Sequence, residues 1–271
     1  MLNRLLILTC LVLVGEQGTL LVAQRQYREG AVQNGGAIRG TVTLAGAIPS
    51  LAVMPVAKDE NLCGRSKPSP RLVVNAQGGV RYSVVYLEGI RPGKRMNHPM
   101  KAVLDQRSCI YEPHIVLVPA NGTLEIVNSD PILHNVHTYN LQKGLTTVFN
   151  IAQPIRGQRT PLPTSAFDGP GFYRATCDAG HPWMSAYIVL MDHPYYAVTD
   201  EKGEYVLNSV PPGTYRIVMW HEGVRVTRTD VEKGTVRQYS YEDPYIVTKE
   251  VVVTPNNVVT VDFQFELRKN L

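Results

Sequence analysis

One short stretch of the chain, from Cys177 to Met184, places three metal-ligand side chains close together: Cys177, His181 and Met184. Residues 171–176 before it and 185–191 after it read as β-strands, because they are rich in aromatic and β-branched side chains. Thiolate and thioether sulfurs favour Cu(I), while imidazole suits both oxidation states of copper. The stretch therefore predicts a copper-binding loop held between two strands.

The loop alone leaves an ordinary alternative open, in which a buried cysteine and a core methionine fill space beside a loop histidine. A trigonal copper site needs a second imidazole. His134 offers it, in the upstream run Asn128-Ser-Asp-Pro-Ile-Leu-His-Asn135. The upstream histidine, followed by the strand–loop–strand with its three ligands, favours the metal site.

These residues resemble the cupredoxin family, the plastocyanin-like electron carriers, over roughly residues 111–191. The resemblance implies a Greek-key β-sandwich that holds one copper ion through four ligands: His134, Cys177, His181 and Met184. It also implies that Asn135 ties the two ligand-bearing segments together by hydrogen bonds, as residues around metal ligands commonly do.

The spacing inside the loop departs from that family. Plastocyanin-like loops usually leave more residues between histidine and methionine, and the His181-x2-Met184 spacing is closer to the end of the dicopper loop of cytochrome oxidase. The single cysteine of this loop argues against a dicopper site. His137 would face away from His134 on a regular strand, so it is an extra ligand only if the strand bends, or it belongs to a second metal site. His114 is expected to be a hydrogen-bonded histidine instead of a ligand.

The first residues predict export. Arg4 precedes the apolar run Leu5–Val14, and Leu21–Ala23 offers a small-residue cleavage site, so residues 1–23 read as a secretory signal. The apolar run is about ten residues long, well short of the roughly twenty that span a bilayer. We expect a periplasmic or secreted protein with no integral membrane span after cleavage, and an uncleaved anchor is the alternative.

The cysteines predict one disulfide. Removal of the signal leaves Cys63, Cys109 and Cys177. An oxidising compartment permits disulfides, and if Cys177 binds copper, Cys63 and Cys109 remain as the pair. Two free buried cysteines are the alternative.

Composition favours an all-β protein, since 22 Gly and 19 Pro interrupt a chain of 271 residues that shows little helical periodicity. A net charge of +4 without basic runs argues against nucleic-acid binding. Residues 24–36 read as a flexible leader. Strands are expected at residues 37–44, 72–74 and 80–87, and a hairpin turning at Asn121-Gly122 joins residues 115–118 to 123–127. The proline-containing residues 140–168 are a surface connection or, alternatively, a docking loop for an anionic partner.

A second pattern begins after Met191. Asp200, Gly203 and Tyr205 precede the run Val210-Pro-Pro-Gly-Thr-Tyr215, which indicates strands joined by tight turns. The pattern resembles the carboxypeptidase regulatory-like module, a small transthyretin-like β-sandwich, over about residues 194–267, with residues 223–250 as an insertion. The resemblance implies packing or interaction without catalysis. The predicted fold is two β-sandwich domains, a cupredoxin-like one at residues 37–192 and a transthyretin-like one at 193–271.

The leading functional hypothesis is an exported mononuclear blue-copper protein that carries single electrons between redox partners and is not an enzyme. His181, beside Trp183, would present its ring edge at an apolar surface where a partner protein docks. The alternative is an envelope protein in which copper is stored or structural. An enzyme would need an open coordination position, for which the sequence offers little.

Overall fold

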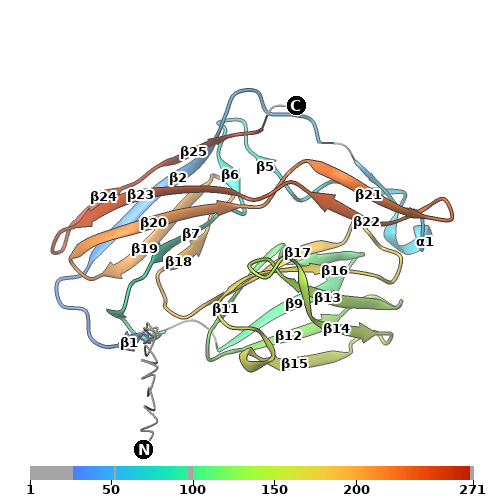
Figure 1. The fold of residues 1–271 in the computed structure, drawn as a ribbon, viewed down its shortest axis with the longest axis horizontal. Helices are drawn as coiled ribbons and strands as arrows, with labels where there is room; N and C mark the ends of the chain where they lie inside the picture. Colours follow the sequence, from blue (N-terminus) through green and yellow to red (C-terminus); the bar gives the residue numbers. More distant parts are fainter. Residues whose placement is uncertain (1–26, 52, 97–99, 269–271) are drawn as a thin grey trace, which may run out of the picture.

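The computed structural model describes residues 27–51, 53–96 and 100–268, so the predicted signal and the first three residues of the predicted leader lie outside the described residues. The rest of the leader is not simply flexible, because Arg28–Glu29 forms a strand that pairs with Pro92–Gly93. Strands dominate the described chain, and helix is limited there to α1 (Glu60–Cys63) and the 3₁₀ turn η1 (Thr164–Ala166). No helix in these ranges is long and apolar enough to cross a membrane. The predicted all-β fold with two sandwiches is confirmed (Figure 1).

One sandwich, here called the inserted sandwich, contains strands β9 to β17. Its first sheet has the order β10 (Ile110–Glu112), β9 (Lys101–Arg107), β12 (Thr123–Asn128) and β15 (Arg159–Pro163). Its second sheet has the order β11 (Ile115–Pro119), β17 (Ser185–Met191), β16 (Gly171–Thr176), β13 (His134–Asn140) and β14 (Thr146–Gln153). Leu104, Ile126 and Ile188 are fully buried in its core.

The other sandwich, here called the split sandwich, takes strands from both ends of the described chain. One sheet has the order β18 (Tyr196–Val198), β7 (Val84–Glu88), β20 (Gly213–His221) and β23 (Tyr245–Val253). In the other, β2 (Gly36–Ala45) pairs with β19 (Glu204–Val210) on one side and with β24 (Val258–Thr260) and β25 (Phe263–Glu266) on the other. Ile38, Leu87 and Phe263 lie in its core.

This arrangement differs from the predicted boundary between residues 192 and 193. β2 and β7 precede the inserted sandwich but pair with β19, β24 and β20, which follow it. The early strands therefore belong to the split sandwich, and not to the predicted copper domain. The alternation of side chains in β2 correctly indicates a half-buried strand, but a period of two does not specify which strand it pairs with.

Two further expectations are corrected. The segments at residues 115–118 and 123–127 do not form a hairpin, because β11 pairs with β17 and β12 pairs with β9 and β15. The turn between them passes from one sheet to the other. Residues 140–168 form β14 and the edge strand β15, and an edge position tolerates the prolines of β15. Residues 223–250 contain an ordered hairpin, β21 (Val226–Glu232) and β22 (Thr235–Tyr241).

The described residues also form short two-stranded sheets outside the two sandwiches. They are β1 (Arg28–Glu29) with β8 (Pro92–Gly93), β3 (Met54–Pro55) with β4 (Ser66–Lys67), and β5 (Val73–Val74) with β6 (Val80–Arg81). The segment from Met54 to Lys67, which contains α1, is here called the cap, because it covers the candidate site described below.

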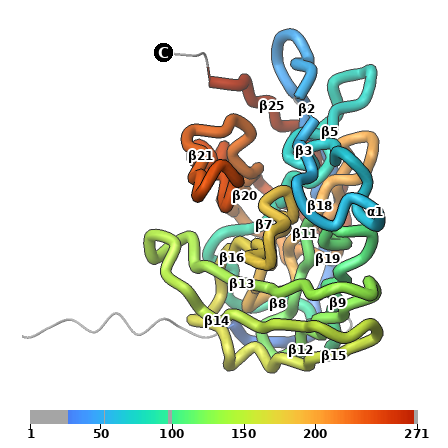
Figure 2. Tube along the Cα trace, turned by 90° about the vertical axis from the view of Figure 1, so that its right-hand side faces the viewer, coloured from blue at the N-terminus to red at the C-terminus, as the bar shows by residue number. Residues whose placement is uncertain are grey.

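The sheet that contains β16 and β17 is buried on both faces. On β17, Ala186, Ile188 and Leu190 point into the core of the inserted sandwich, while Tyr187 and Val189 pack against the split sandwich. All seven residues of β17 are buried. Figures 1 and 2 both place the inserted sandwich beneath the split one, with this sheet between them.

A buried polar network crosses the same interface. Arg71 pairs with Glu222, which also contacts His114 Nε2. Arg71 Nη2 donates to Ser185 Oγ at 2.9 Å, and His114 Nδ1 lies 3.0 Å from the Ser185 carbonyl oxygen. His114 is therefore a hydrogen-bonded histidine, as predicted. Because Ser185 directly follows Met184, the network fixes the end of the ligand-bearing loop to the split sandwich.

This network gives a pH prediction. Burial opposes ionisation of Glu222, but Arg71 and His114 outweigh it and lower its pKa from 4.5 to about 2. A depressed native pKa stabilises the fold above pH 4.5, and this stabilisation is lost as the pH falls from 4.5 towards 2. The shift corresponds to roughly 3 kcal/mol.

Glu222→Gln should lower the free energy of unfolding at neutral pH and should flatten the loss of stability between pH 4.5 and 2, measured by urea unfolding at several pH values. The exposed Glu88→Gln should leave the profile unchanged, and an unchanged profile for Glu222→Gln would contradict the assignment.

Candidate metal centre

Three predicted ligands meet at one point inside the inserted sandwich. His134 begins β13, Cys177 directly follows β16, and His181 lies in the loop before β17. The Nδ1 atoms of the two histidines are 3.1 Å apart, and Cys177 Sγ lies 3.9 Å from His134 Nδ1 and 3.5 Å from His181 Nδ1. All three side chains are buried, and their donor atoms form one metal-ligand group.

Two carboxylates set the orientation of the imidazoles. Asp130 Oδ2 lies 3.0 Å from His134 Nε2, and Asp59 Oδ2 lies 2.9 Å from His181 Nε2. A carboxylate that accepts a hydrogen bond from Nε2–H leaves the lone pair on Nδ1, so both free nitrogens face the cysteine sulfur. Asp130 is itself held by the backbone N–H groups of Ser108 and Cys109, each at 2.8 Å. The result is two carboxylate–histidine pairs of the kind that support metal ligands.

The donor set fits a cation better than it fits an empty core. Two nitrogen lone pairs 3.1 Å apart repel each other, and a cation between them removes that repulsion. The three separations are compatible with bonds of about 2.0 Å to nitrogen and about 2.3 Å to sulfur. Burial lowers the pKa values of His134 and His181, against the opposing effect of Asp130 and Asp59. Burial also raises the pKa of the Cys177 thiol, so metal binding must displace the thiol proton.

Asn135 lies where the sequence predicts a connecting residue. Its Oδ1 accepts hydrogen bonds from the backbone N–H groups of Asp178 (2.7 Å) and Ala179 (3.1 Å). Its Nδ2 donates to Asn150 Oδ1 at 2.7 Å. The side chain thus joins β13, which carries His134, to the loop that carries Cys177 and His181.

The cap closes the site from outside. Its Cys63 forms a disulfide with Cys109, which confirms the predicted pairing, and Cys177 is the free cysteine among the described residues. Lys58 Nζ donates to the Ala179 carbonyl oxygen at 2.6 Å, and Asp59 contacts His181. The cap is thereby fastened both to the sandwich and to the ligand-bearing loop.

The cap corrects the prediction of a docking surface at Trp183. The Trp183 ring is 3% exposed and His181 is fully buried. Trp183 Nε1 donates to the Cys109 carbonyl oxygen at 2.9 Å, beside the disulfide. The sequence places these rings on a loop at the end of a sandwich, but the distant cap covers that end.

The two remaining candidates behave differently. Met184 is 1% exposed within the same core cluster as Cys177, and its role as an axial ligand stays a prediction. His137 does not join the metal-ligand group. Its Nδ1 lies 2.6 Å from Asp178 and its Nε2 lies 2.9 Å from Thr147, on the other face of β13. The strand does not bend enough to bring His137 to the site.

Sequence reasoning missed Asp59 and the role of Asp130. Asp130 precedes His134 by four residues in a proline-containing loop. A carboxylate so close to a predicted ligand could have been recognised as a hydrogen-bond partner of the imidazole. Asp59 is 122 residues from His181 and stands in no pattern.

No protein-family model matches the sequence, and no curated protein matches it. Among solved structures, a purple cupredoxin from Nitrosopumilus maritimus is 20% identical, with a TM-score of 0.28 over 34% of this chain and 98% of that one. An amicyanin from Paracoccus versutus is 19% identical, with a TM-score of 0.29 over 40% of this chain and 97% of that one. A copper-containing nitrite reductase from Thermus scotoductus is 20% identical, with a TM-score of 0.27 over 35% of this chain and 23% of that one.

Proposed function

We propose that this chain is an exported mononuclear copper protein, and that it carries single electrons instead of catalysing a reaction. The observation that carries the proposal is the convergence of His134 Nδ1, Cys177 Sγ and His181 Nδ1 on one buried point. Copper held there would accept and release one electron as it changes between Cu(II) and Cu(I). Two imidazoles with one thiolate are the donor set of trigonal electron-transfer sites.

The surroundings support this use because they keep the donor atoms in place. Asp130, Asp59 and Asn135 fix the ligand-bearing segments, and the adjacent strands are packed on both faces. A site that rearranges little between oxidation states suits electron transfer. Titration with copper should give one ion per chain, and voltammetry should then give a reversible one-electron wave.

A second function is favoured by a specific observation. His181 and Trp183 are buried under the cap, and Asp59 occupies the outer nitrogen of His181. A covered site suits copper that is stored or structural. Voltammetry separates the two functions, since a stored ion need not exchange electrons reversibly. An irreversible or absent wave from protein with a full copper site would favour the second function.

We also propose Met184 as the axial ligand. A thioether there weakly stabilises Cu(I), so Met184→Gln should lower the potential by placing a harder oxygen donor on the axis. A tenfold change in the Cu(II)/Cu(I) affinity ratio corresponds to about 59 mV, which voltammetry resolves. A lower melting temperature with an unmoved potential would make Met184 a core residue instead, because the amide would be buried without a partner.

Asp59 is proposed to tune the site through His181. Its negative charge favours Cu(II), so Asp59→Asn should raise the potential and weaken copper binding by roughly 10- to 100-fold, as is typical for residues that hold a metal ligand. Asp178→Asn is the matched control, because that carboxylate lies beside Cys177 in sequence but contacts His137. Equal effects of the two variants on potential and affinity would show a general charge effect and no special role for Asp59.

The split sandwich is proposed to be the carboxypeptidase regulatory-like module, with its first strands placed before the inserted sandwich. Asp200 Oδ1 accepts from the Lys202 and Glu204 N–H groups, and Gly203 has φ +79°, which supports the tight turn inferred from the sequence. Its proposed role is to support the copper domain and to contact a partner. Export is proposed from the N-terminal sequence, and N-terminal sequencing of the mature protein tests it.

A further inference from the structure

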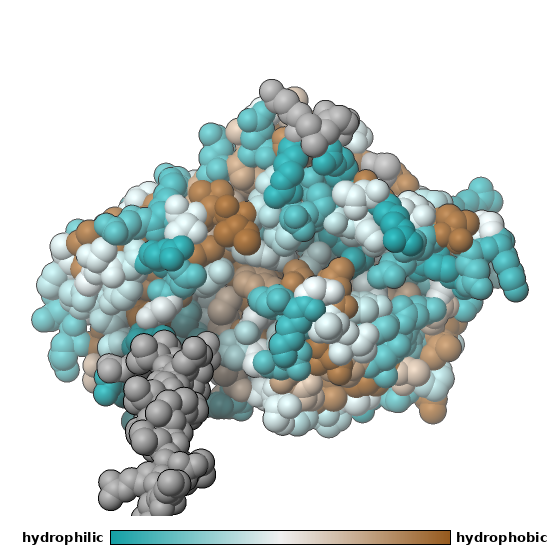
Figure 3. Space-filling view, viewed as in Figure 1, coloured by the Kyte–Doolittle hydropathy of each residue, from teal (hydrophilic) through white to brown (hydrophobic). Residues whose placement is uncertain are grey.

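A cavity of about 630 Å³ lies between the two sandwiches, away from the metal centre. Its walls come from β16 and β17 of the inserted sandwich and from β7, β20, β22 and β23 of the split one. In the space-filling view the surface is hollowed between the two sandwiches (Figure 3). The volume falls within the range of small-molecule sites, which often lie between domains.

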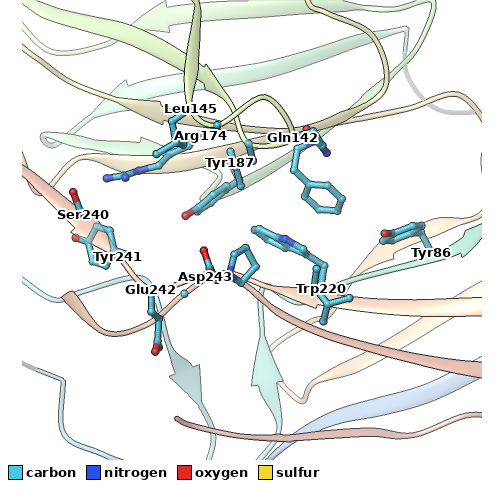
Figure 4. Close-up of a pocket in the computed structure, with 16 residues that line it drawn as sticks. Tyr86, Gln142, Leu145, Arg174, Tyr187, Trp220, Ser240, Tyr241, Glu242 and Asp243 are labelled. Atoms are coloured by element: carbon cyan, nitrogen blue, oxygen red, sulfur yellow. The ribbon is translucent and has the colours of Figure 1, made fainter. Parts of the chain in front are cut away.

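One wall of the cavity is aromatic. Phe172 and Trp220 stack with ring centroids 4.5 Å apart and an interplanar angle of 29°. Tyr187 meets Trp220 edge-on at 5.1 Å, and Tyr86 lies 5.9 Å from Phe172. Figure 4 shows Trp220 and Tyr86 on one side of the cavity, with Arg174, Ser240 and Tyr241 on the opposite side. Flat aromatic faces of this kind bind flat aromatic ligands.

The opposite wall carries a buried charge without a matching carboxylate. Arg174 is 7% exposed, and its Nη2 donates to the Tyr239 carbonyl oxygen at 2.9 Å. Its Nε is buried without a hydrogen-bond partner, and no described carboxylate lies within ion-pair distance of its guanidinium. An unpaired buried guanidinium is unfavourable unless an anion joins it.

The two nearby carboxylates that are buried, Glu222 and Glu242, do not pair with Arg174. Glu222 is engaged by Arg71 and His114, and Arg71 also lies over the Tyr241 ring. Glu242 accepts from the Tyr245 hydroxyl and from two backbone N–H groups, and its carboxylate lies near Arg225 and Arg268. Burial and the charge of Arg71 lower the pKa of Arg174, so the cavity already disfavours this cation.

We propose that this cavity binds an aromatic carboxylate, with the ring system against Trp220 and Phe172 and the carboxylate on Arg174. The aromatic wall supplies affinity without strong selectivity among flat rings. Arg174 supplies selectivity for an anion, because a carboxylate can accept hydrogen bonds from the free Nε and from the guanidinium fork. The proposal does not depend on copper at the metal centre.

The test compares naphthalene-2-carboxylate with its neutral counterpart naphthalene-2-carboxamide, titrated calorimetrically into the full chain. We expect the carboxylate to bind at least tenfold more tightly than the amide. Arg174→Met should remove that preference while leaving amide binding unchanged. Arg228→Met is the matched control, because Arg228 is exposed and paired with Asp230, and it should retain the preference.

Fluorescence locates the ligand independently of Arg174. The sequence has two tryptophans, Trp183 and Trp220, and the carboxylate should quench Trp220 emission. In Trp220→Phe the remaining Trp183 emission should not respond to the ligand. The proposal is overturned if neither compound binds, if both bind equally, if Arg174→Met keeps the preference, or if quenching persists in Trp220→Phe.

Discussion

Copper-loaded Cys177→Ser should be colourless, whereas the wild-type protein should absorb strongly in the visible. The absorption comes from charge transfer between the Cys177 thiolate and Cu(II), and a serine oxygen cannot provide it. The expected effect is loss of the whole band, because the two histidines that remain lack the sulfur on which the transition depends. Visible absorption after copper titration is the measurement.

His137→Gln provides the matched control for this result. His137 lies on the same strand as His134, but its ring nitrogens contact Asp178 and Thr147. The copper-loaded variant should therefore keep the full colour. A coloured Cys177→Ser protein, or a colourless His137→Gln protein, would show that the metal-ligand group has been assigned wrongly.

Removal of the disulfide should destabilise the protein and open the cap. Cys63 and Cys109 are 46 residues apart, and closing a loop of that size stabilises a fold by about 4 kcal/mol in the chain-entropy treatment. In Cys63→Ala/Cys109→Ala the cap keeps its short strand pair, the contacts of Lys58, Asp59 and Lys67, and the packing of Met54 and Val56 in the core. Urea unfolding of the two proteins gives the loss directly.

Opening of the cap has its own readout. Trp183 is 3% exposed beside Cys109, so its emission should resist acrylamide in the wild type and become quenchable in the double variant. Both proteins should carry Trp220→Phe, so that Trp183 is the sole emitter. Continued protection of Trp183 would mean that packing alone holds the cap and that the disulfide adds only global stability.

The sequence allowed part of the site to be predicted because that part is local. Cys177 and His181 share one loop, and the strands on either side bring that loop to His134. The disulfide followed from counting cysteines. Asp59 could not be predicted, since its contact with His181 depends on how a distant segment folds back over the sandwich. The same reason explains the failure at Trp183, whose burial comes from the cap and not from its own loop.

In the fold, too, the positions of strands could be predicted from local sequence, whereas their pairing over long distances could not. Alternation of side chains located β2 closely, and richness in aromatic and β-branched side chains located β16 and β17. The pairing of β2 with β19, β24 and β25 is not contained in that alternation, because any half-buried strand presents the same pattern to any neighbour.

The position of one sandwich inside the other sets the order in which a growing chain can fold. The ends of the inserted sandwich lie close together, since the Met100 and Met191 carbonyl oxygens accept from Thr123 and Ala120 in one turn. It can therefore fold as soon as Met191 has been synthesised. β2 can then pair with β19, but its other edge must wait for β24 and β25, near which the Thr41 N–H donates to Asp262 Oδ1, 221 residues later. β7 gains both of its neighbours, β18 and β20, soon after Met191, but one edge of β2 stays open and can pair with other chains until β24 and β25 emerge. A chain with this topology is thus most exposed to aggregation after its inserted sandwich is complete and before its last strands are synthesised.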